Sequence, residues 1–253
     1  MNITPNDLPL YMKVQRAVAM LINHCPKKGY YGCFSGGKDS VVIKRLAEIA
    51  GIKVSWYYRV TTIDPPELIR FIKEHHKDVK LDFSKHGNLT NRMVEKGVFP
   101  TRRTRWCCAE YKENTPANET VLMGVRIAES PRRKDQLHNC FIRDWQKGKD
   151  ACLPIRLWSD EDVWQFIREY KVPYCSLYDE GWKRLGCIGC PMQNRKKRLQ
   201  EFERWPKYEQ MWIRSFNRLW EKRAGTIDRN GNEWFGSREF KTSRELFNWW
   251  LMQ

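Results

Sequence analysis

The segment that most constrains the fold of this chain is a glycine-containing turn between a predicted strand and a predicted helix. Residues 30–34 form a β-like run, and a helical pattern follows the turn to about residue 49. The turn itself reads Ser35-Gly36-Gly37-Lys38-Asp39-Ser40. Glycines let the backbone approach an anion closely, and the free N–H groups at the start of a helix point toward it. The arrangement predicts a phosphate-binding loop, in which both serine hydroxyls donate hydrogen bonds and Lys38 adds a positive charge.

The spacing of this loop distinguishes it from two common phosphate-binding motifs. A Walker A loop requires Gly-x-x-x-x-Gly-Lys-[ST] and a dinucleotide turn requires Gly-x-Gly-x-x-Gly, and the loop matches neither pattern. A structural Gly-Gly turn capped by serine is the alternative. The strand before the turn, the helix after it and the Ser, Lys and Asp side chains within it favour a phosphate site.

Strand-like and helix-like segments alternate through the first two thirds of the chain. Further strands are expected over residues 52–58, 79–83 and 120–125. Helices are expected over residues 6–23, 65–76 and 159–170, the last of them opened by a capping-box pattern. This alternation predicts an α/β fold with a doubly wound, mostly parallel sheet. Residues 126–150 are polar and basic, and we expect them to form a loop that orders around a ligand.

The last quarter of the chain differs in character and predicts a helical C-terminal extension. We expect residues 1–190 to form the nucleotide-binding domain with its cysteine site, and residues 191–253 to form helices broken near residues 225 and 230–231. The extension is basic and holds six of the 12 tryptophans, namely Trp205, Trp212, Trp220, Trp234, Trp249 and Trp250. These rings could provide a base-stacking surface, but an aromatic helical core is the favoured explanation.

Composition narrows the class of protein and its partners. The 46 Lys and Arg residues exceed the 30 Asp and Glu residues, giving a formal charge of +16, which favours a polyanionic partner over simple solubility. The N-terminus lacks the pattern of a secretory signal, and no segment has the apolar length of a membrane span. We therefore expect a cytoplasmic protein without a membrane partner, in which the nine cysteines are reduced thiols or metal ligands.

Two cysteine motifs that lie far apart in the chain predict a metal centre. Cys187 and Cys190 form a CxxC pair in a glycine-rich turn, and Cys107 and Cys108 are adjacent. Neighbouring cysteines rarely converge on one ion, but they can reach different irons of a cubane cluster. The set therefore favours a [4Fe–4S] cluster over the two alternatives, a zinc site or buried free thiols. Two flanking cations, Arg105 and Lys112, suit a negatively charged cluster.

Several motifs in order resemble a known family. The loop at residues 35–40 resembles the pyrophosphate loop of the adenine nucleotide alpha-hydrolase-like superfamily. Residues 61–67 (TTIDPPE), 124–130 (GVRIAES) and 153–187 resemble segments of its phosphoadenosine-phosphosulfate (PAPS) reductase family. The resemblance runs from about residue 25 to residue 191. Assimilatory adenylylsulfate reductases carry a similar tandem pair and CxxC with a nearby lysine, for which Lys112 is the counterpart here.

The resemblance implies roles for individual residues. Nucleotide phosphates would be bound by Ser35, Gly36, Gly37, Lys38, Asp39, Ser40 and Arg126. Among these, Lys38, Asp39 and Arg126 would be catalytic. Arg126 follows a strand-like segment at the end where doubly wound sheets bind ligands, which favours phosphate binding over a solvated role. For Asp39, two roles are open, namely orienting Mg²⁺ and capping the helix. A cluster whose four irons are saturated by four cysteines would be structural or electrostatic rather than a sulfur carrier.

The sequence departs from the family at the position of its best-known nucleophile. Reductases of this family attack sulfur with a cysteine in a C-terminal Glu-Cys-Gly-[IL]-His motif, whereas residues 191–253 contain no cysteine. We therefore favour an ATP pyrophosphatase that uses Mg·ATP to adenylate an acceptor for sulfur incorporation. The chain resembles the ATP pyrophosphatase components of DNA phosphorothioation systems, which implies a nucleic-acid acceptor, DNA rather than tRNA, and a cysteine desulfurase or other sulfur-donor protein. The alternatives are a sulfonucleotide reductase with a non-standard thiol and a non-catalytic nucleotide- and nucleic-acid-binding subunit.

Overall fold

The computed structural model describes residues 8–146, 148–228, 230–235 and 240–253. The chain divides into two compact units made of interleaved segments. The first consists of Met1–Arg59, Pro66–Asp82 and Thr115–Leu185, and the second of Val60–Pro65, Phe83–Asn114 and Gly186–Gln253. The expected division at residue 190 runs through the second unit, which also contains the tandem cysteines.

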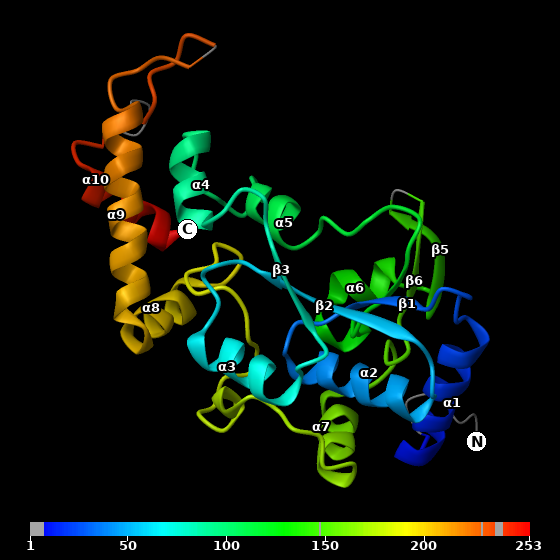
Figure 1. Cartoon of the computed structure of the whole chain (residues 1–253). Coiled ribbons are helices and arrows are strands. Elements are labelled where there is room, and N and C mark those ends of the chain that lie inside the picture. Colours follow the sequence, from blue (N-terminus) through cyan, green and yellow to red (C-terminus); the bar gives the residue numbers. More distant parts are fainter. Residues whose placement is uncertain (1–7, 147, 229, 236–239) are drawn as a thin grey trace. The chain divides into compact units, whose positions relative to one another are not determined.

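The first unit is built on a six-stranded sheet with the order β3-β2-β1-β4-β6-β5 (Figure 1). The strands are β1 (Tyr30–Cys33), β2 (Val54–Val60), β3 (Lys80–Phe83), β4 (Thr120–Leu122), β5 (Phe141–Gln146) and β6 (Lys149–Cys152). Strand β1 pairs in parallel with β2 and β4, and β4 pairs in parallel with β6. Only the edge pair β5–β6 among the registers described is antiparallel. The predicted α/β fold with a mostly parallel sheet is confirmed.

Helices of the first unit follow the expected order. They are α1 (Leu10–Asn23), α2 (Lys38–Ile49), α3 (Pro66–His75), α6 (Pro131–Gln136) and α7 (Asp160–Glu169), with 3₁₀ turns η1 (Ile127–Glu129) and η2 (Ser176–Tyr178). Helices α1, α2 and α7 pack against one another. Asp162 completes the predicted capping box of α7 with Ser159. It also forms an ion pair with Lys13 of α1, and the distance from Lys13 Nζ to Asp162 Oδ1 is 2.8 Å. One buried carboxylate thereby both caps a helix and joins two helices.

The expectation of a loop over residues 126–150 is wrong. This stretch contains η1, α6 and the hairpin β5–β6, which turns at Gly148 with φ of +71°. Ile142 and Trp145 of β5 pack against the buried cluster of Tyr31, Val121 and Ala151. Because β5 is a short edge strand with an irregular register, its polar residues conceal the alternation by which a strand is usually recognised.

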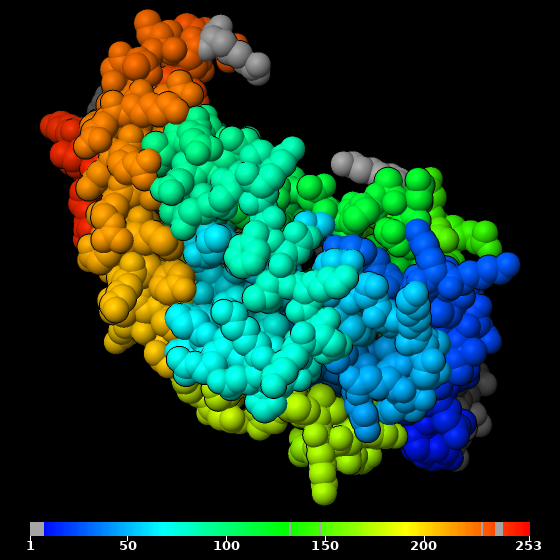
Figure 2. All heavy atoms as spheres, in the orientation of Figure 1, coloured from blue at the N-terminus to red at the C-terminus, as the bar shows by residue number. Residues whose placement is uncertain are grey.

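The second unit is helical. Its helices are α4 (Leu89–Lys96), α5 (Trp106–Tyr111), α8 (Arg195–Arg204), α9 (Pro206–Arg223) and α10 (Ser243–Met252). Helix α9 packs against α4 and α10, and Figure 2 shows α9 in orange beside α4 in green-cyan. The rings of Trp212 and Trp250 are fully buried with centroids 4.8 Å apart. The predicted helical extension is confirmed, and these two tryptophans belong to its aromatic core rather than to a base-stacking surface. No helix in the described residues is long and apolar enough to cross a membrane.

A buried histidine makes the stability of the first unit depend on pH. His76 is 6% exposed, its ring lies against those of Phe34 and Phe71, and its Nε2 has no hydrogen-bond partner in the described residues. Burial, assisted by the charge of Lys44, lowers the pKa of His76 from 6.5 to about 4. As the pH falls, His76 is protonated in the unfolded chain near pH 6.5 and in the folded protein only near pH 4. The free energy of unfolding should therefore fall between these two pH values, by roughly 2–3 kcal/mol.

Urea denaturation between pH 4 and 8 measures this dependence. The His76→Phe variant should lose most of the slope between pH 6.5 and 4, since phenylalanine fills the same apolar site and does not titrate. His75→Phe, at the exposed neighbouring position, should keep the slope. An unchanged slope in His76→Phe would refute the assignment.

Candidate functional site

The predicted phosphate loop lies at the point where the strand order of the sheet reverses. Strand β1 has β2 on one side and β4 on the other, and the loop connects the carboxyl end of β1 to the start of α2 (Figure 1). This switch point is where open α/β sheets bind ligands. Gly36 has φ of +70°, and a Cβ atom there would lie 2.5 Å from Cδ1 of Leu68. Glycine is therefore required at this position for both backbone conformation and space.

Side chains of the loop hold its own backbone. The Gly37 N–H donates to Ser35 Oγ at 3.3 Å, Ser35 Oγ donates to Ser40 Oγ at 3.2 Å, and Ser40 Oγ donates to the Gly37 carbonyl at 2.8 Å. The Lys38 N–H donates to the hydroxyl of Tyr178 at 2.9 Å. The serines predicted to bind phosphate thus also fix the shape of the loop.

Two carboxylates and two cations meet beside the loop. Arg126 is 1% exposed, and its guanidinium lies 2.5 Å from Oδ1 of Asp39 and 2.6 Å from Oδ1 of Asp160. Its Nη1 donates to the Trp158 carbonyl at 3.1 Å. Lys38 Nζ lies 3.3 Å from Asp160. Asp39 and Asp160 therefore neutralise the cations that the sequence assigned to phosphate, and Gly37, rather than Asp39, occupies the cap position of α2.

The charged side chains beside the loop shift one another's pKa values. Burial disfavours the charged form of Arg126, but Asp39 and Asp160 outweigh it and raise the pKa of the guanidinium. Burial opposes ionisation of Asp160 as well, yet hydrogen bonds from Arg126 and the charge of Lys38 lower the pKa of this carboxyl. Both shifts favour the ionised forms of Arg126 and Asp160.

Sequence reasoning missed three residues of this site. In the sequence, Asp160 belongs to the capping-box pattern at residue 159, and Tyr178 belongs to the family-like block over residues 153–187. Gly124 packs the end of β4 against α2, since a Cβ atom there would lie 2.8 Å from the carbonyl oxygen of Asp39. All three residues lie in recognisable sequence motifs, which mark them as candidates for the site. That they lie close to the loop is decided by the fold.

The four predicted cysteine ligands lie around one small cavity in the second unit. The cavity measures about 30 Å³ and is lined by Thr61, Ile63, Leu89, Pro100, Cys107, Cys108, Lys112, Cys187, Cys190, Pro191 and Trp212. The fold therefore brings the tandem pair and the CxxC together, with Lys112 beside them. Each of the nine cysteines is a free thiol. Within the described part of the chain, no group of three or more His, Cys, Asp or Glu side chains is placed to hold a metal ion.

The predicted flanking cations act on these thiols. A hydrogen bond with Cys108 raises the pKa of Arg105. The Cys107 thiol and the Arg105 guanidinium together lower the pKa of Cys108, against the effect of burial. The charge on Cys187 raises the pKa of Lys112 despite burial of the ammonium group. Only the Cys108 thiol is made more acidic, because the hydrogen bond to Cys108 and burial raise the pKa of Cys107, and burial raises the pKa of Cys187 to about 11 and that of Cys190.

Residues of the C-terminal helices hold the CxxC turn. Glu201 of α8 accepts a hydrogen bond from the Gly189 N–H at 2.8 Å, and Trp212 of α9 donates to the Ile188 carbonyl at 3.2 Å. Gly189 has φ of +75°, and a Cβ atom there would lie 2.7 Å from the ring of Phe202. The helical extension therefore shapes the cysteine site, a role that the sequence did not reveal.

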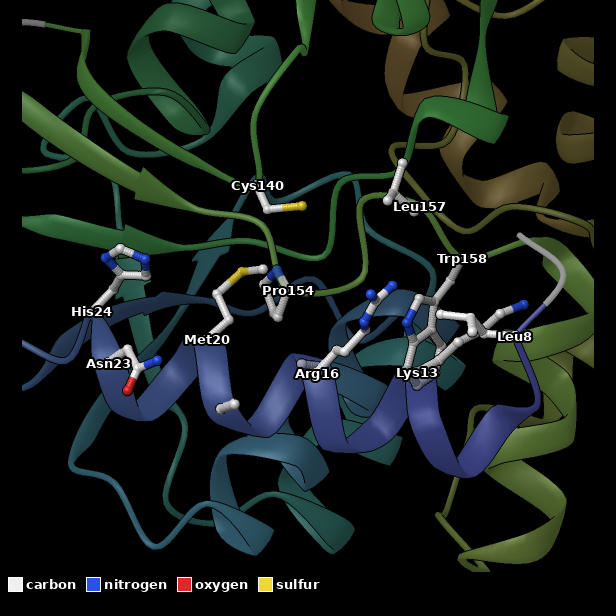
Figure 3. A pocket seen from close by; sticks show the side chains of 12 residues that line it. Leu8, Lys13, Arg16, Met20, Asn23, His24, Cys140, Pro154, Leu157 and Trp158 are labelled. Carbon is white, nitrogen blue, oxygen red and sulfur yellow. The ribbon is translucent and has the colours of Figure 1, made fainter. Parts of the chain in front are cut away.

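A larger cavity of about 440 Å³ lies in the first unit (Figure 3). It is lined by residues of α1, among them Arg16 and Met20, by His24 directly after the helix, and by residues on the other side that include Cys140 and Trp158. The Trp158 carbonyl accepts a hydrogen bond from Arg126, so this wall also supports the nucleotide site. No pattern in the sequence indicates this cavity.

A mostly parallel sheet with a phosphate-binding type of loop at its switch point is typical of nucleotide-binding α/β folds. Residues 30–193 match the family model of the phosphoadenosine phosphosulfate reductase domain, and the chain belongs to this family.

The relatives include proteins of known and unknown activity. The chain is 31% identical over 202 residues to an uncharacterized protein of Methanocaldococcus jannaschii, a match that covers 72% of this chain and 41% of that protein. It is 36% identical over 176 residues to an adenosine 5'-phosphosulfate reductase of Staphylococcus epidermidis, covering 63% of this chain and 69% of the relative. A crystal structure of PAPS reductase from Candida auris shares the fold, with a TM-score of 0.53 and 19% identity over 69% of this chain and 87% of that chain. The chain thus spans less than half the length of the Methanocaldococcus relative.

Proposed function

We propose that this protein is an ATP pyrophosphatase that adenylates an acceptor for sulfur incorporation. The observation that carries the proposal is the pair of carboxylates, Asp39 and Asp160, beside the anion loop. Magnesium is usually bound through one or two carboxylates together with substrate phosphates. The pair is suited to Mg·ATP, whereas a sulfonucleotide whose sulfur is attacked by a thiol has no need of it.

The proposed reaction is a displacement at phosphorus. An acceptor oxygen attacks the α-phosphorus of Mg·ATP, a new P–O bond forms, and the bond from the α-phosphorus to the bridging oxygen breaks to release pyrophosphate. The loop from Ser35 to Ser40 would hold the leaving pyrophosphate. Lys38 and Arg126 would offset the charge that develops on it, after Asp39 and Asp160 turn from these cations toward the metal.

The acceptor class is inferred from charge and family resemblance. The formal charge of +16 favours a nucleic acid over a small metabolite. Adenylation turns a phosphate or carbonyl oxygen into a good leaving group, so a sulfur nucleophile can replace it. We therefore propose a nucleic-acid acceptor, with DNA favoured over tRNA, and a cysteine desulfurase or another persulfide-bearing protein as the sulfur donor.

The second unit offers four thiols around one cavity, which is the donor chemistry that a [4Fe–4S] cluster requires. Cys107, Cys108, Cys187 and Cys190 would hold it, since all four line one cavity and adjacent cysteines can serve different irons. When bound, such a cluster supplies a fixed charge and an electron-transfer centre. Lys112 and Arg105 lie beside the thiols and would stabilise their deprotonated forms.

Sulfonucleotide reduction is the second candidate. It is favoured by the 36% identity to a protein named adenosine 5'-phosphosulfate reductase. Against it, residues 191–253 contain no cysteine to act as the nucleophile.

Incubation of the anaerobically purified protein with either nucleotide separates these candidates. We expect pyrophosphate release from Mg·ATP, increased by DNA, and no sulfite release from adenosine 5'-phosphosulfate or PAPS. Sulfite release would establish the reductase instead. Binding without turnover of either nucleotide would identify a non-catalytic subunit.

The carboxylates provide a matched set of variants for this assay. Asp39→Asn and Asp160→Asn should each lower pyrophosphate release by roughly 10- to 100-fold, with a higher Mg²⁺ requirement. The control is Asp78→Asn. Asp78 pairs with buried Lys44 at 3.0 Å, as Asp160 pairs with buried Lys38, but it is not part of the loop site. Full activity in both loop variants would remove the support for Mg·ATP.

A further inference from the structure

A buried arginine on α8 has more hydrogen-bond donors than partners. Arg198 is 0% exposed. Its Nη1 donates to the Trp250 carbonyl oxygen at 2.9 Å. Its Nε and Nη2 are buried and have no hydrogen-bond partner among the residues that the structure describes. A buried cation with unpaired donors is unfavourable, and an anion that accepted these hydrogen bonds would relieve it.

The surroundings of Arg198 connect it to the cysteine cavity. Its guanidinium lies 5.4 Å from the centre of the Trp250 ring, and that ring contacts Trp212, which lines the cavity. Arg198 and Glu201 are one turn apart on α8 and therefore share a face of the helix. Glu201 directs its carboxylate to the Gly189 N–H of the CxxC turn. Arg198 thus packs on the aromatic layer that contains Trp212 and shares a helix face with Glu201, and both of these residues contact that turn.

The charges near Arg198 agree with this position. Burial and the charge of Arg102 lower the pKa of Arg198, and the charges on Cys190 and Glu201 oppose them. Arg102 itself donates to the carbonyl oxygens of Pro191 and Gln193, just beyond the CxxC. Arg102 therefore holds the backbone just beyond the CxxC, and the charge of Cys190 in the same turn acts on Arg198.

We propose that Arg198 provides positive charge and N–H donors for a negatively charged metal–thiolate centre held by Cys107, Cys108, Cys187 and Cys190. The inference rests on the proposed function, because it requires the cluster. A cluster with four thiolate ligands carries net negative charge, and nearby cations and hydrogen bonds to its sulfurs raise its reduction potential. Arg198 is a positioning residue that does not ligate iron. Its place on α8 explains why a buried charge is retained in an otherwise aromatic helical core.

The Arg198→Met variant tests this role, because methionine keeps an unbranched, flexible stem and removes the charge and the donors. After anaerobic reconstitution with iron and sulfide, its midpoint potential should be more negative than that of the wild type, by about a tenfold change in the reduction equilibrium, or ~59 mV for one electron. Iron should also pass to a chelator several-fold faster. In the metal-free protein the buried guanidinium has no anion to pair with, so Arg198→Met should melt at a higher temperature than the wild type. Arg198→Lys, which restores the charge without the planar fork, should recover part of the potential.

Arg195→Met is the matched control, since Arg195 is an exposed arginine one turn earlier on α8. It should leave potential, iron release and melting unchanged. If the wild type holds the cluster and Arg198→Met has the same potential and iron release, the role of Arg198 is refuted while the cluster stands. If the reconstituted wild type holds no iron, both the cluster and the inference fail. A metal-free Arg198→Met protein that melts below the metal-free wild type would also count against it, because the guanidinium would then be satisfied without an anion.

Discussion

Replacing Gly36 by alanine is expected to abolish measurable nucleotide binding at the anion loop. The new Cβ atom would require an L-residue at φ of +70° and would lie 2.5 Å from Leu68 Cδ1 and 3.0 Å from Ile72 Cδ1. Both of these side chains are 1% exposed and cannot move aside freely, so the loop must shift instead. A displacement of about 1 Å in such a loop can cost on the order of 10²-fold in binding or rate. Isothermal titration with Mg·ATP measures the loss directly.

Gly51→Ala is the matched control for this prediction. Gly51 follows α2 in the same unit with φ of +63°, and a Cβ atom there would meet nothing within 4 Å. Both variants should lose about 1–2 kcal/mol of stability from the left-handed conformation. Only Gly36→Ala should also lose the nucleotide. Wild-type affinity in Gly36→Ala would show that the loop is not the nucleotide site.

Replacing Gly189 by alanine is expected to produce the largest loss of stability in the second unit. Its Cβ atom would lie 2.7 Å from Phe202 Cζ and 2.8 Å from Trp212 Nε1, at a φ of +75°. The two rings are buried and rigid, so the turn must move and the hydrogen bond from Trp212 to Ile188 is lost. Left-handed strain of about 1–2 kcal/mol adds to overpacking of about 1–3 kcal/mol. Urea denaturation should report this loss, and iron content after reconstitution should fall well below that of the wild type.

The control for Gly189 is Gly225→Ala in the same unit. Gly225 has φ of +74°, and a Cβ atom there would lie in open space. It should show the strain alone and retain wild-type iron content. If Gly189→Ala binds as much iron as Gly225→Ala, then the geometry of the CxxC turn does not determine cluster binding.

Each candidate site lies within one of the two compact units. The loop, Arg126, Asp160 and Tyr178 belong to the first unit, and the four cysteines belong to the second with α8 and α9. The extension beyond residue 190 is consequently part of the cysteine site. Its basic character, which suggested a surface for nucleic acid, includes at least one cation, Arg198, that is fully buried.

The sequence alone determined the features that are local in the chain. The anion loop could be predicted because its strand, glycines and helix are consecutive, and the hydrogen bonds of Ser35, Gly37 and Ser40 close within six residues. The α/β class followed from alternating segments whose periodicity is set by burial. Where that periodicity was weak, as in the edge strand β5, the prediction failed.

Only the tertiary structure decided which distant groups meet. Asp160 and Tyr178 reach the loop, and Glu201 and Trp212 reach the CxxC turn, through packing that no local pattern encodes. A charged side chain is normally solvated, so the sequence alone does not predict that Arg126 and Arg198 are buried. Both are buried because the fold surrounds them, Arg126 with two carboxylates and Arg198 with the Trp250 ring and carbonyl group. The charges and hydrogen bonds at the two sites therefore depend on long-range packing, which a local sequence pattern does not specify.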